Sequence, residues 1–315
     1  MTQQKTKVKF LYRAGHVNQG AKIMRCDQLC EIANQFLAEA YEFEAMALPR
    51  PGQFRKQREL VETLKGSIII FLKRADRAIE PTILEELRQS VRGMAIDYVD
   101  AAMLPWADVP MDVHFCASFT AKKTLDVMLN GPFGPPINAR TSAQLVLHHA
   151  DPRLKPVSRS NEKMAMGYFG KPSNAFMTES ISKLVSDTNR EADPEGRFLQ
   201  GIERYDLHYC VRKVANSNPK LAIKPFTKVF NAAACGANVL INKQVPDAID
   251  LLGKDYPFMV EDATEAQVIW GLKRAADAFG TVVWNNALDR MGHIRSQIEP
   301  KKIALQLNNA LQNML

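Results

Sequence analysis

The chain has 315 residues, 46% of them apolar and 24% charged, a composition typical of a globular protein with two domains. Its 41 basic and 34 acidic residues give a formal charge of +7, a mild excess that, without long basic blocks, disfavours a dedicated DNA-binding protein. No stretch approaches the roughly 20 apolar residues of a membrane-spanning helix, and the polar start MTQQKTKVKF lacks the apolar core of a secretory signal, so we expect a cytoplasmic protein.

Short apolar runs alternate with helical patterns along the first half of the chain. Strands are expected at residues 7–12, 43–48, 67–72, 94–99, 111–116 and 143–148. Helices are expected at residues 19–41, 53–65, 80–91 and 120–129, and the Gly/Pro-rich GPFGPP at residues 131–136 predicts a turn. Because strand and helix follow each other in succession, residues 1–160 are expected to form a Rossmann-like domain, a parallel sheet with helices on both faces.

The polar, Pro-containing segment DPRLKPVSRSNEK at residues 151–163 predicts a domain boundary near residue 160. Beyond it, strands are expected at residues 164–169, 198–202, 206–211, 237–241 and 257–260. Helices are expected at residues 175–186, 225–235 and 264–278 and along the C-terminal stretch. Residues 161–315 should therefore form a second Rossmann-like domain, with a last helix that can cross back to the first. Ligands of such sheets bind beyond the carboxyl ends of the strands, so we expect the chemistry in a cleft between the two domains.

Several motifs of other enzyme classes do not occur in the sequence. There is no GxxxxGK[ST], no GxGxxG after a strand and no GxSxG, which disfavours kinases, nicotinamide dehydrogenases and serine hydrolases of those types. The five cysteines form no CxxC pair, so neither a disulfide framework nor a zinc site is indicated. Asp97 and Asp100 in DYVD come near a metal-binding DxD pair without forming one, and we expect no metal.

The most informative segment is KPFTKVFNAAACGANVL, residues 224–240. On a helix, Lys224, Lys228 and Asn231 fall within an arc of about 60°, opposite an apolar face. Pro225 suits the first helical position, which leaves the amides of residues 226–228 free to bind an anion beside the two lysines. A diphosphate fits this arrangement, although lysines in a first turn also occur on merely solvated faces.

The same segment resembles the donor-binding helix and following strand of GT-B glycosyltransferases. MAMGYFGKP at residues 164–172 is similar to the first strand of that family's C-terminal domain, with Gly170 and Lys171 in the turn that faces the nucleotide diphosphate. MDVHFCAS at residues 111–118 and VLHHADPRL at residues 146–154 resemble late strands of the N-terminal domain, the latter with a histidine near the sugar in many members. The resemblance spans nearly the whole chain through the order of these motifs.

The sequence departs from the family at two positions. Asn231 stands where many members hold a glutamate that binds the ribose, and a carboxamide accepts from a hydroxyl without bringing a charge. The earlier glutamate of the family's two-glutamate pattern falls near Ile223, so that pattern is absent.

The resemblance implies a metal-independent, cofactor-free transfer of a sugar from a nucleotide-diphosphate donor, such as a UDP- or GDP-sugar, to an acceptor hydroxyl. The expected setting is bacterial envelope polysaccharide or glycoconjugate synthesis, with the first domain holding the acceptor and the second the donor. The implied residues are Gly170, Lys171, Arg212, Lys224, Thr227 and Lys228 for the donor diphosphate, Asn231 for the nucleoside, and His16, His148 and His149 for catalysis.

The individual candidates have competing interpretations. His16, in the glycine-bearing loop RAGHVNQG, is either a general base or a surface histidine, and either His148 or His149 is expected to contact the sugar. Arg212, at the end of a strand, either reaches a phosphate or forms a structural ion pair. Lys73 and Arg74, which follow the strand SIIIFL, either line the acceptor side or form a solvated pair.

The acceptor is less specified than the donor. The first 160 residues carry 22 basic and 17 acidic residues and the remainder 19 and 17, which favours an anionic acceptor. Three kinds of acceptor fit this charge: an envelope polysaccharide, a lipid-linked glycan at the inner membrane face, and modified DNA. A lipid-linked glycan implies peripheral membrane association. Nucleic acid fits least well. A nucleotide-sugar epimerase of the same fold and a non-catalytic nucleic-acid or glycan-binding module remain as alternatives.

Overall fold

A computed structural model describes residues 4–103, 109–131, 141–185, 187–189, 201–213 and 223–315. The chain divides into two compact units, residues 1–148 with 300–315 and residues 149–299. We call them unit 1 and unit 2. The division falls at His149, before the boundary expected near residue 160, and the C-terminal residues belong to the first unit. None of the helices within the described ranges is long and apolar enough to cross a membrane.

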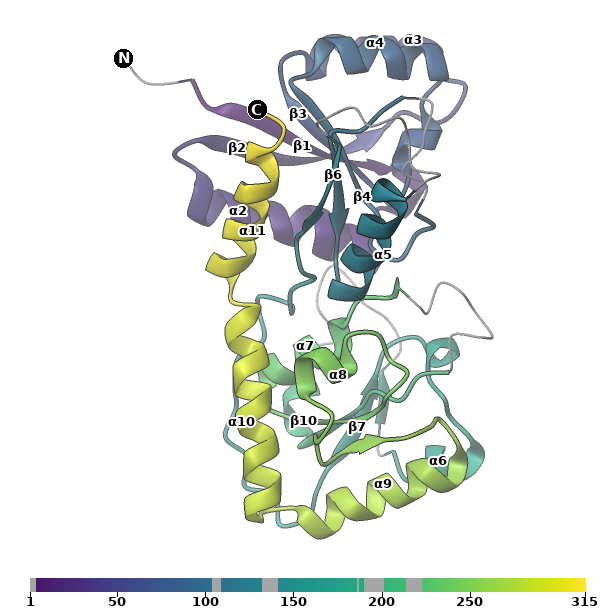
Figure 1. Ribbon diagram of the computed structural model, residues 1–315, viewed down its shortest axis with the longest axis vertical. Coiled ribbons are helices and arrows are strands. Elements are labelled where there is room, and N and C mark those ends of the chain that lie inside the picture. The colour runs from purple at the N-terminus through teal and green to yellow at the C-terminus, as the bar shows by residue number, and fades with distance from the viewer. Residues whose placement is uncertain (1–3, 104–108, 132–140, 186, 190–200, 214–222) are drawn as a thin grey trace. The chain divides into compact units, whose positions relative to one another are not determined.

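Unit 1 is built on a six-stranded, entirely parallel sheet with the order β2-β1-β3-β4-β5-β6 (Figure 1). The strands are β1 (Thr6–Arg13), β2 (Tyr41–Leu48), β3 (Ile68–Leu72), β4 (Gly93–Asp97), β5 (Val113–Cys116) and β6 (Ser142–Leu145). β3 is buried at every position, as a parallel strand covered on both faces must be, which explains its unbroken apolar sequence. The strand order reverses between β1 and β3, so this pair is the topological switch point of unit 1.

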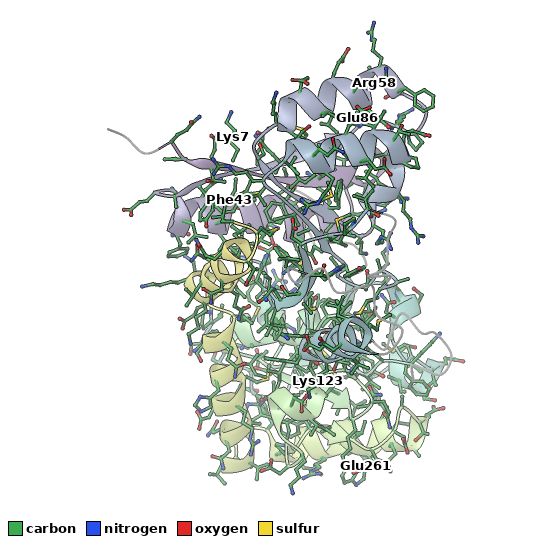
Figure 2. The ribbon with its side chains drawn as sticks, turned by 45° about the horizontal axis from the view of Figure 1, so that its top comes forward. Lys7, Phe43, Arg58, Glu86, Lys123 and Glu261 are labelled. Atoms are coloured by element: carbon green, nitrogen blue, oxygen red, sulfur yellow. The ribbon has the colours of Figure 1, made fainter. Side chains whose placement is uncertain are left out.

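The helices of unit 1 cover both faces of its sheet, with α3 and α4 side by side on one face and α2 on the other (Figure 1). They are α1 (Gly20–Lys22), α2 (Leu29–Leu37), α3 (Phe54–Leu64), α4 (Pro81–Ser90), α5 (Phe119–Asn130) and α11 (Pro300–Gln312). A π-helical segment, Ile23–Gln28, joins α1 to α2. Charged side chains such as Arg58 on α3 and Glu86 on α4 point away from the sheet (Figure 2), as the amphipathic pattern requires.

The last helix of the chain, α11, completes the core of unit 1. Ile303, Leu307 and Leu311 are fully buried in the same apolar cluster as Phe10 of β1 and Leu29 of α2. Gln306 also accepts a hydrogen bond from the Leu147 amide at 2.8 Å. The end of the chain therefore folds together with its beginning.

Unit 2 has a five-stranded parallel sheet with the order β11-β10-β9-β7-β8. Its strands are β7 (Met166–Phe169), β8 (Asp187–Asn189), β9 (Leu207–Tyr209), β10 (Asn238–Asn242) and β11 (Met259–Val260). Its helices are α6 (Glu179–Ser182), α7 (Thr227–Cys235), α8 (Ala248–Leu252), α9 (Glu265–Ala278) and α10 (Val282–Gln297). Here the strand order reverses between β7 and β9, which is the topological switch point of unit 2.

The structure differs from the expected elements at several places. The helix expected at residues 175–186 is confined to α6, because Ala175 pairs with Arg212 in an isolated antiparallel bridge and stays extended. In place of the strand expected at residues 198–202, Ile202–Arg204 forms a 3-10 turn, and residues 198–200 lie outside the described ranges. The edge strand β8 had no signal in the sequence. The helix expected at residues 19–41 ends at Leu37. Of the turn expected at GPFGPP, only Gly131 lies within the described residues.

Candidate functional site

The switch point of unit 2 brings most of the predicted diphosphate-binding residues to one edge of its sheet. Gly170 and Lys171 follow β7, Arg212 lies beyond β9, and Thr227 and Lys228 begin α7. The apolar side of α7 packs into the core of unit 2, where Ala232 and Ala233 have no exposed surface. Small side chains allow this close packing, which fixes the helix start relative to the strand ends.

The centre of this edge is a contact between Lys228 and Tyr168, the next-to-last residue of β7. The Lys228 Nζ donates a hydrogen bond of 2.8 Å to the Tyr168 hydroxyl and lies 4.4 Å from the centroid of the tyrosine ring. The hydroxyl in turn donates to the carbonyl oxygen of Lys171 at 2.6 Å. Gly170 has a φ of 138°, and a Cβ there would lie 2.6 Å from the Lys228 Cε. Only glycine leaves room for the lysine in this position.

The charge of Lys228 is poorly solvated. Burial, together with the positive charges of Arg212 and Lys224, lowers the pKa of Lys228 to about 7. Within the described ranges Lys228 forms no ion pair, and its neighbours Arg212 and Lys224 carry charges of the same sign. A bound anion would relieve both the repulsion and the desolvation.

Arg212 forms hydrogen bonds with the segment that precedes α7. Its guanidinium donates to the carbonyl oxygens of Lys224 at 3.3 Å and Pro225 at 2.9 Å. Its amide donates to the Asn242 Oδ1 at 2.9 Å, which ties the segment to the neighbouring strand. These bonds fix the segment before the helix to the residues that follow β9.

The helix itself begins later than the sequence indicated. α7 starts at Thr227 with Phe226 as its N-cap, so Pro225 is not a helical residue. The expectation that Lys224 and Lys228 share one helical face was therefore wrong, because Lys224 precedes the helix. The amides of Thr227 and Lys228 have no acceptor within the helix, since the first turn of an α-helix lacks one.

Asn231 lies one turn further along α7 and is buried. Its Oδ1 accepts a hydrogen bond of 3.1 Å from the amide of Asp151. The Asn231 Oδ1, expected to accept from a ribose hydroxyl, thus already accepts a hydrogen bond within the protein. This bond links the start of unit 2 to α7. A role of Asn231 toward a nucleoside stays a prediction.

The three candidate histidines are distributed over the two units. His16 is partly buried in the loop after β1, and His148 is buried at the end of unit 1. His149 begins unit 2, where its Nδ1 lies 2.6 Å from the carbonyl oxygen of Ala150. Their catalytic roles, like the expected cleft between the domains, stay predictions.

Residues at the carboxyl ends of β3 and β4 form buried or half-buried ion pairs in unit 1. Lys73 pairs with Asp100 at 2.5 Å, and Arg74 pairs with Asp76 at 2.8 Å. Neither basic residue is therefore half of a freely solvated pair. Asp97, fully buried, pairs with Arg25 of the π-helical segment at 2.7 Å. Both carboxylates of the DYVD motif thus have basic partners.

A cavity of about 550 Å³ lies on the same side of unit 1. The loop after β2, the turn after β3 and the start of α4 line it, with Arg74, Arg77 and Glu80 among its polar residues. Its volume lies within the range of small-molecule binding sites. Within the described ranges, no cluster of three or more His, Cys, Asp or Glu side chains suited to a metal was found.

Tyr168 is the functional candidate that the sequence analysis did not identify. Side chains alternate along a strand, so the residue two positions before Gly170 faces the same side as the loop glycine. That alternation in GYFGK was the available signal. Its hydrogen bond to Lys228 joins residues 60 positions apart, which no local pattern specifies.

Comparisons with known proteins give a fold match without a sequence match. No protein-family model and no curated protein sequence matches the chain. Among the solved structures that it resembles is Anabaena HepE in complex with UDP, with a TM-score of 0.61, 12% identity, and coverage of 98% of this chain and 100% of that one. A lipopolysaccharide outer core galactosyltransferase, WaaB, matches with a TM-score of 0.59, 9% identity and coverage of 98% and 100%. An α-glucosyltransferase in complex with UDP-glucose and DNA containing an abasic site matches with a TM-score of 0.56, 10% identity and coverage of 98% and 99%. The chain has the α/β fold of the GT-B glycosyltransferases, with two Rossmann-like units.

Proposed function

We propose that this protein is a glycosyltransferase that moves a sugar from a nucleotide-diphosphate donor to an acceptor hydroxyl without a metal. The observation that carries the proposal is the group of three cations, Arg212, Lys224 and Lys228, at the switch point of unit 2. Structures that share the fold hold UDP and UDP-glucose, which supports a uridine nucleotide as the first donor to test.

The chemistry follows from where charge develops during transfer. As the bond between the sugar and the diphosphate breaks, negative charge accumulates on the departing phosphate oxygens. Lys228, fixed by Tyr168, and the open amides of Thr227 and Lys228 would stabilise that charge without having to reorganise. Preorganised cations of this kind take the role that a metal ion has in other transferases.

The acceptor side of the proposal belongs to unit 1. In this proposal His16, in the turn after β1, takes the proton of the acceptor hydroxyl, and the cavity of about 550 Å³ is within the size range of small-molecule sites. One solved structure with this fold is a lipopolysaccharide galactosyltransferase, which favours an envelope polysaccharide or glycoconjugate as the acceptor. Association with the inner membrane face is part of this proposal only for a lipid-linked acceptor.

The experiment is a thermal-shift and calorimetric panel of UDP-, GDP-, CMP- and dTDP-sugars, followed by turnover of any donor that binds. We expect one nucleotide class to stabilise the protein, and turnover to persist in EDTA. Lys228→Ala should lower turnover roughly a hundredfold, since loss of one preorganised donor costs about 3 kcal/mol. An epimerase would convert the donor without an acceptor, and a non-catalytic binding module would leave every donor unbound.

A further inference from the structure

The switch point of unit 1 also gathers basic groups. Arg13, the last residue of β1, donates through Nη2 to the carbonyl oxygen of Arg74 at 2.9 Å. No ion pair of Arg13 occurs within the described ranges, and its Nε is shielded from solvent and lacks a hydrogen-bond partner there. An enclosed guanidinium N–H without an acceptor is costly, which indicates that an acceptor atom belongs beside it.

Two further groups lie at the same edge. Lys73 follows β3, the strand next to β1, and is a quarter exposed beside Asp100. His16 lies three residues after Arg13, and burial together with the charges of Arg13 and Lys73 lowers the pKa of this histidine. The two cations are therefore close enough to act on the same imidazole. Lys73 is paired with Asp100, whereas the Arg13 Nε has no acceptor within the described ranges.

Backbone strain is concentrated at the same edge. Lys73, Arg74 and Val99 have φ values of 49°, 61° and 57°, and they follow the adjacent strands β3 and β4. Non-glycine residues avoid this region, a β-branched valine most of all. Such strain persists where the surrounding structure enforces it, and it is concentrated at ligand-binding edges. The contacts of Arg13 with the Arg74 carbonyl and of Lys73 with Asp100 are among those that fix this segment.

We propose that Arg13 and Lys73 bind a phosphate monoester group carried by the acceptor, at the switch point of unit 1. This deepens, and rests on, the glycosyltransferase function proposed above, because it names the acceptor as a phosphorylated saccharide. A phosphate monoester carries nearly two negative charges at neutral pH, and its oxygens fit both the Arg13 guanidinium, which has no ion pair within the described ranges, and the Lys73 ammonium group beside Asp100. Arg74, whose carbonyl accepts from Arg13, also lines the cavity of unit 1.

The test uses the full chain and the imidazole resonance of His16, assigned by its loss in His16→Gln. Methyl phosphate is titrated into the protein, and sodium acetate and sodium chloride are titrated separately at matched ionic strength. We expect methyl phosphate alone to shift the resonance saturably and to raise the measured pKa of His16, because a bound anion offsets the neighbouring cations. The absence of a saturable shift, or an equal response to acetate or chloride, would overturn the proposal.

The matched variants are Arg13→Gln and Lys7→Gln, which remove one charge from opposite ends of the same strand, with Lys7 exposed (Figure 2). Arg13→Gln should raise the half-saturating methyl phosphate concentration about tenfold or more, and Lys7→Gln should leave it unchanged. If circular dichroism shows that Arg13→Gln does not fold, Arg13→Lys is used instead. This variant keeps the positive charge but lacks the paired N–H donors of the guanidinium group, so it should still weaken binding. Equal binding by the wild type and a folded Arg13 variant counts against the proposal.

Calorimetry with UDP separates this proposal from the donor site. Arg13→Gln should bind UDP as the wild type does, because Lys228 and its neighbours belong to unit 2. If the wild type binds UDP while His16 does not respond to methyl phosphate, the acceptor site alone is wrong. If His16 responds and no nucleotide binds, the phosphate site stands and the glycosyltransferase function fails.

Discussion

The surroundings of Lys228 determine both the position and the pKa of its amine. The Tyr168 ring and hydroxyl hold the amine in one place, while burial and two neighbouring cations bring its pKa close to neutral. The folded-state pKa lies below the unfolded value, so the unfolded chain binds more protons between pH about 7 and 10.5. The contribution of this lysine to stability is therefore least favourable below pH 7 and improves as the pH rises through that window.

Nucleotide binding should consequently be coupled to proton uptake. At pH 8 the Lys228 amine is mostly neutral in the free protein, and a bound diphosphate favours its protonated form. Calorimetry of UDP binding in buffers of different ionisation enthalpy should show uptake of up to about one proton at pH 8 and little at pH 6. Lys228→Met should abolish the buffer dependence. Identical enthalpies in all buffers at pH 8 for the wild type would contradict this assignment.

Tyr168 should act as a positioning residue rather than through direct contact with the reacting atoms. In Tyr168→Phe the ring remains beneath the ammonium group, but the hydroxyl that links Lys228 to the Lys171 carbonyl is lost. We expect UDP affinity to fall about tenfold, the cost of one hydrogen bond to a charged group, and the proton-uptake profile to change with it. Tyr205→Phe, a tyrosine of unit 2 that packs against Phe169, is the control. A purely structural role would lower thermal stability but leave the uptake profile unchanged.

At the residue level the sequence located the cations but not their partners. The spacing of the lysines and the position of Pro225 predicted an anion-binding helix start within residues 224–231. Lys228 does lie at the start of a helix. The local pattern could not show that Lys224 precedes the helix, where its carbonyl oxygen accepts from Arg212, a residue beyond β9. Nor could it show that Asn231 bonds to Asp151, 80 residues earlier. Such contacts depend on the tertiary fold, which local periodicity does not encode.

At the level of elements, regular patterns predicted the strands and helices well, and their failures have local causes. The unbroken apolar run of β3 and the amphipathic pattern of α3 were sufficient because burial alone determines them. The helix expected at residues 175–186 failed because backbone pairing of Ala175 with Arg212 overrides helical propensity. The short strand β8, at the edge of its sheet, has too few residues for periodicity to reveal it.

The role of α11 gives a stability prediction. Leu307 is fully buried in the core cluster of unit 1, whereas Leu305 on the same helix is 57% exposed. Leu307→Ala should lower the free energy of unfolding by about 2–5 kcal/mol, through lost burial and the cavity that remains. Leu305→Ala should change it by less than about 0.5 kcal/mol. Urea unfolding followed by circular dichroism measures both, and equal effects of the two substitutions would show that α11 does not belong to this core.

For the molecule as a whole, two doubly wound sheets each place basic groups at their switch point. In unit 2 these are Arg212, Lys224 and Lys228, which we assign to the donor diphosphate. In unit 1 they are Arg13 and Lys73, which we assign to the acceptor phosphate.

The central claim is that the start of α7 binds the diphosphate of the donor, and UDP calorimetry at pH 7 tests it most directly. The comparison is between the wild type, Lys228→Ala, and Lys273→Ala, which removes an exposed lysine of α9. We predict that the wild type and Lys273→Ala bind UDP equally, and that Lys228→Ala binds about a hundredfold more weakly, because a half-buried charge partner of the phosphate is lost. Equal affinity of Lys228→Ala and the wild type would contradict the account.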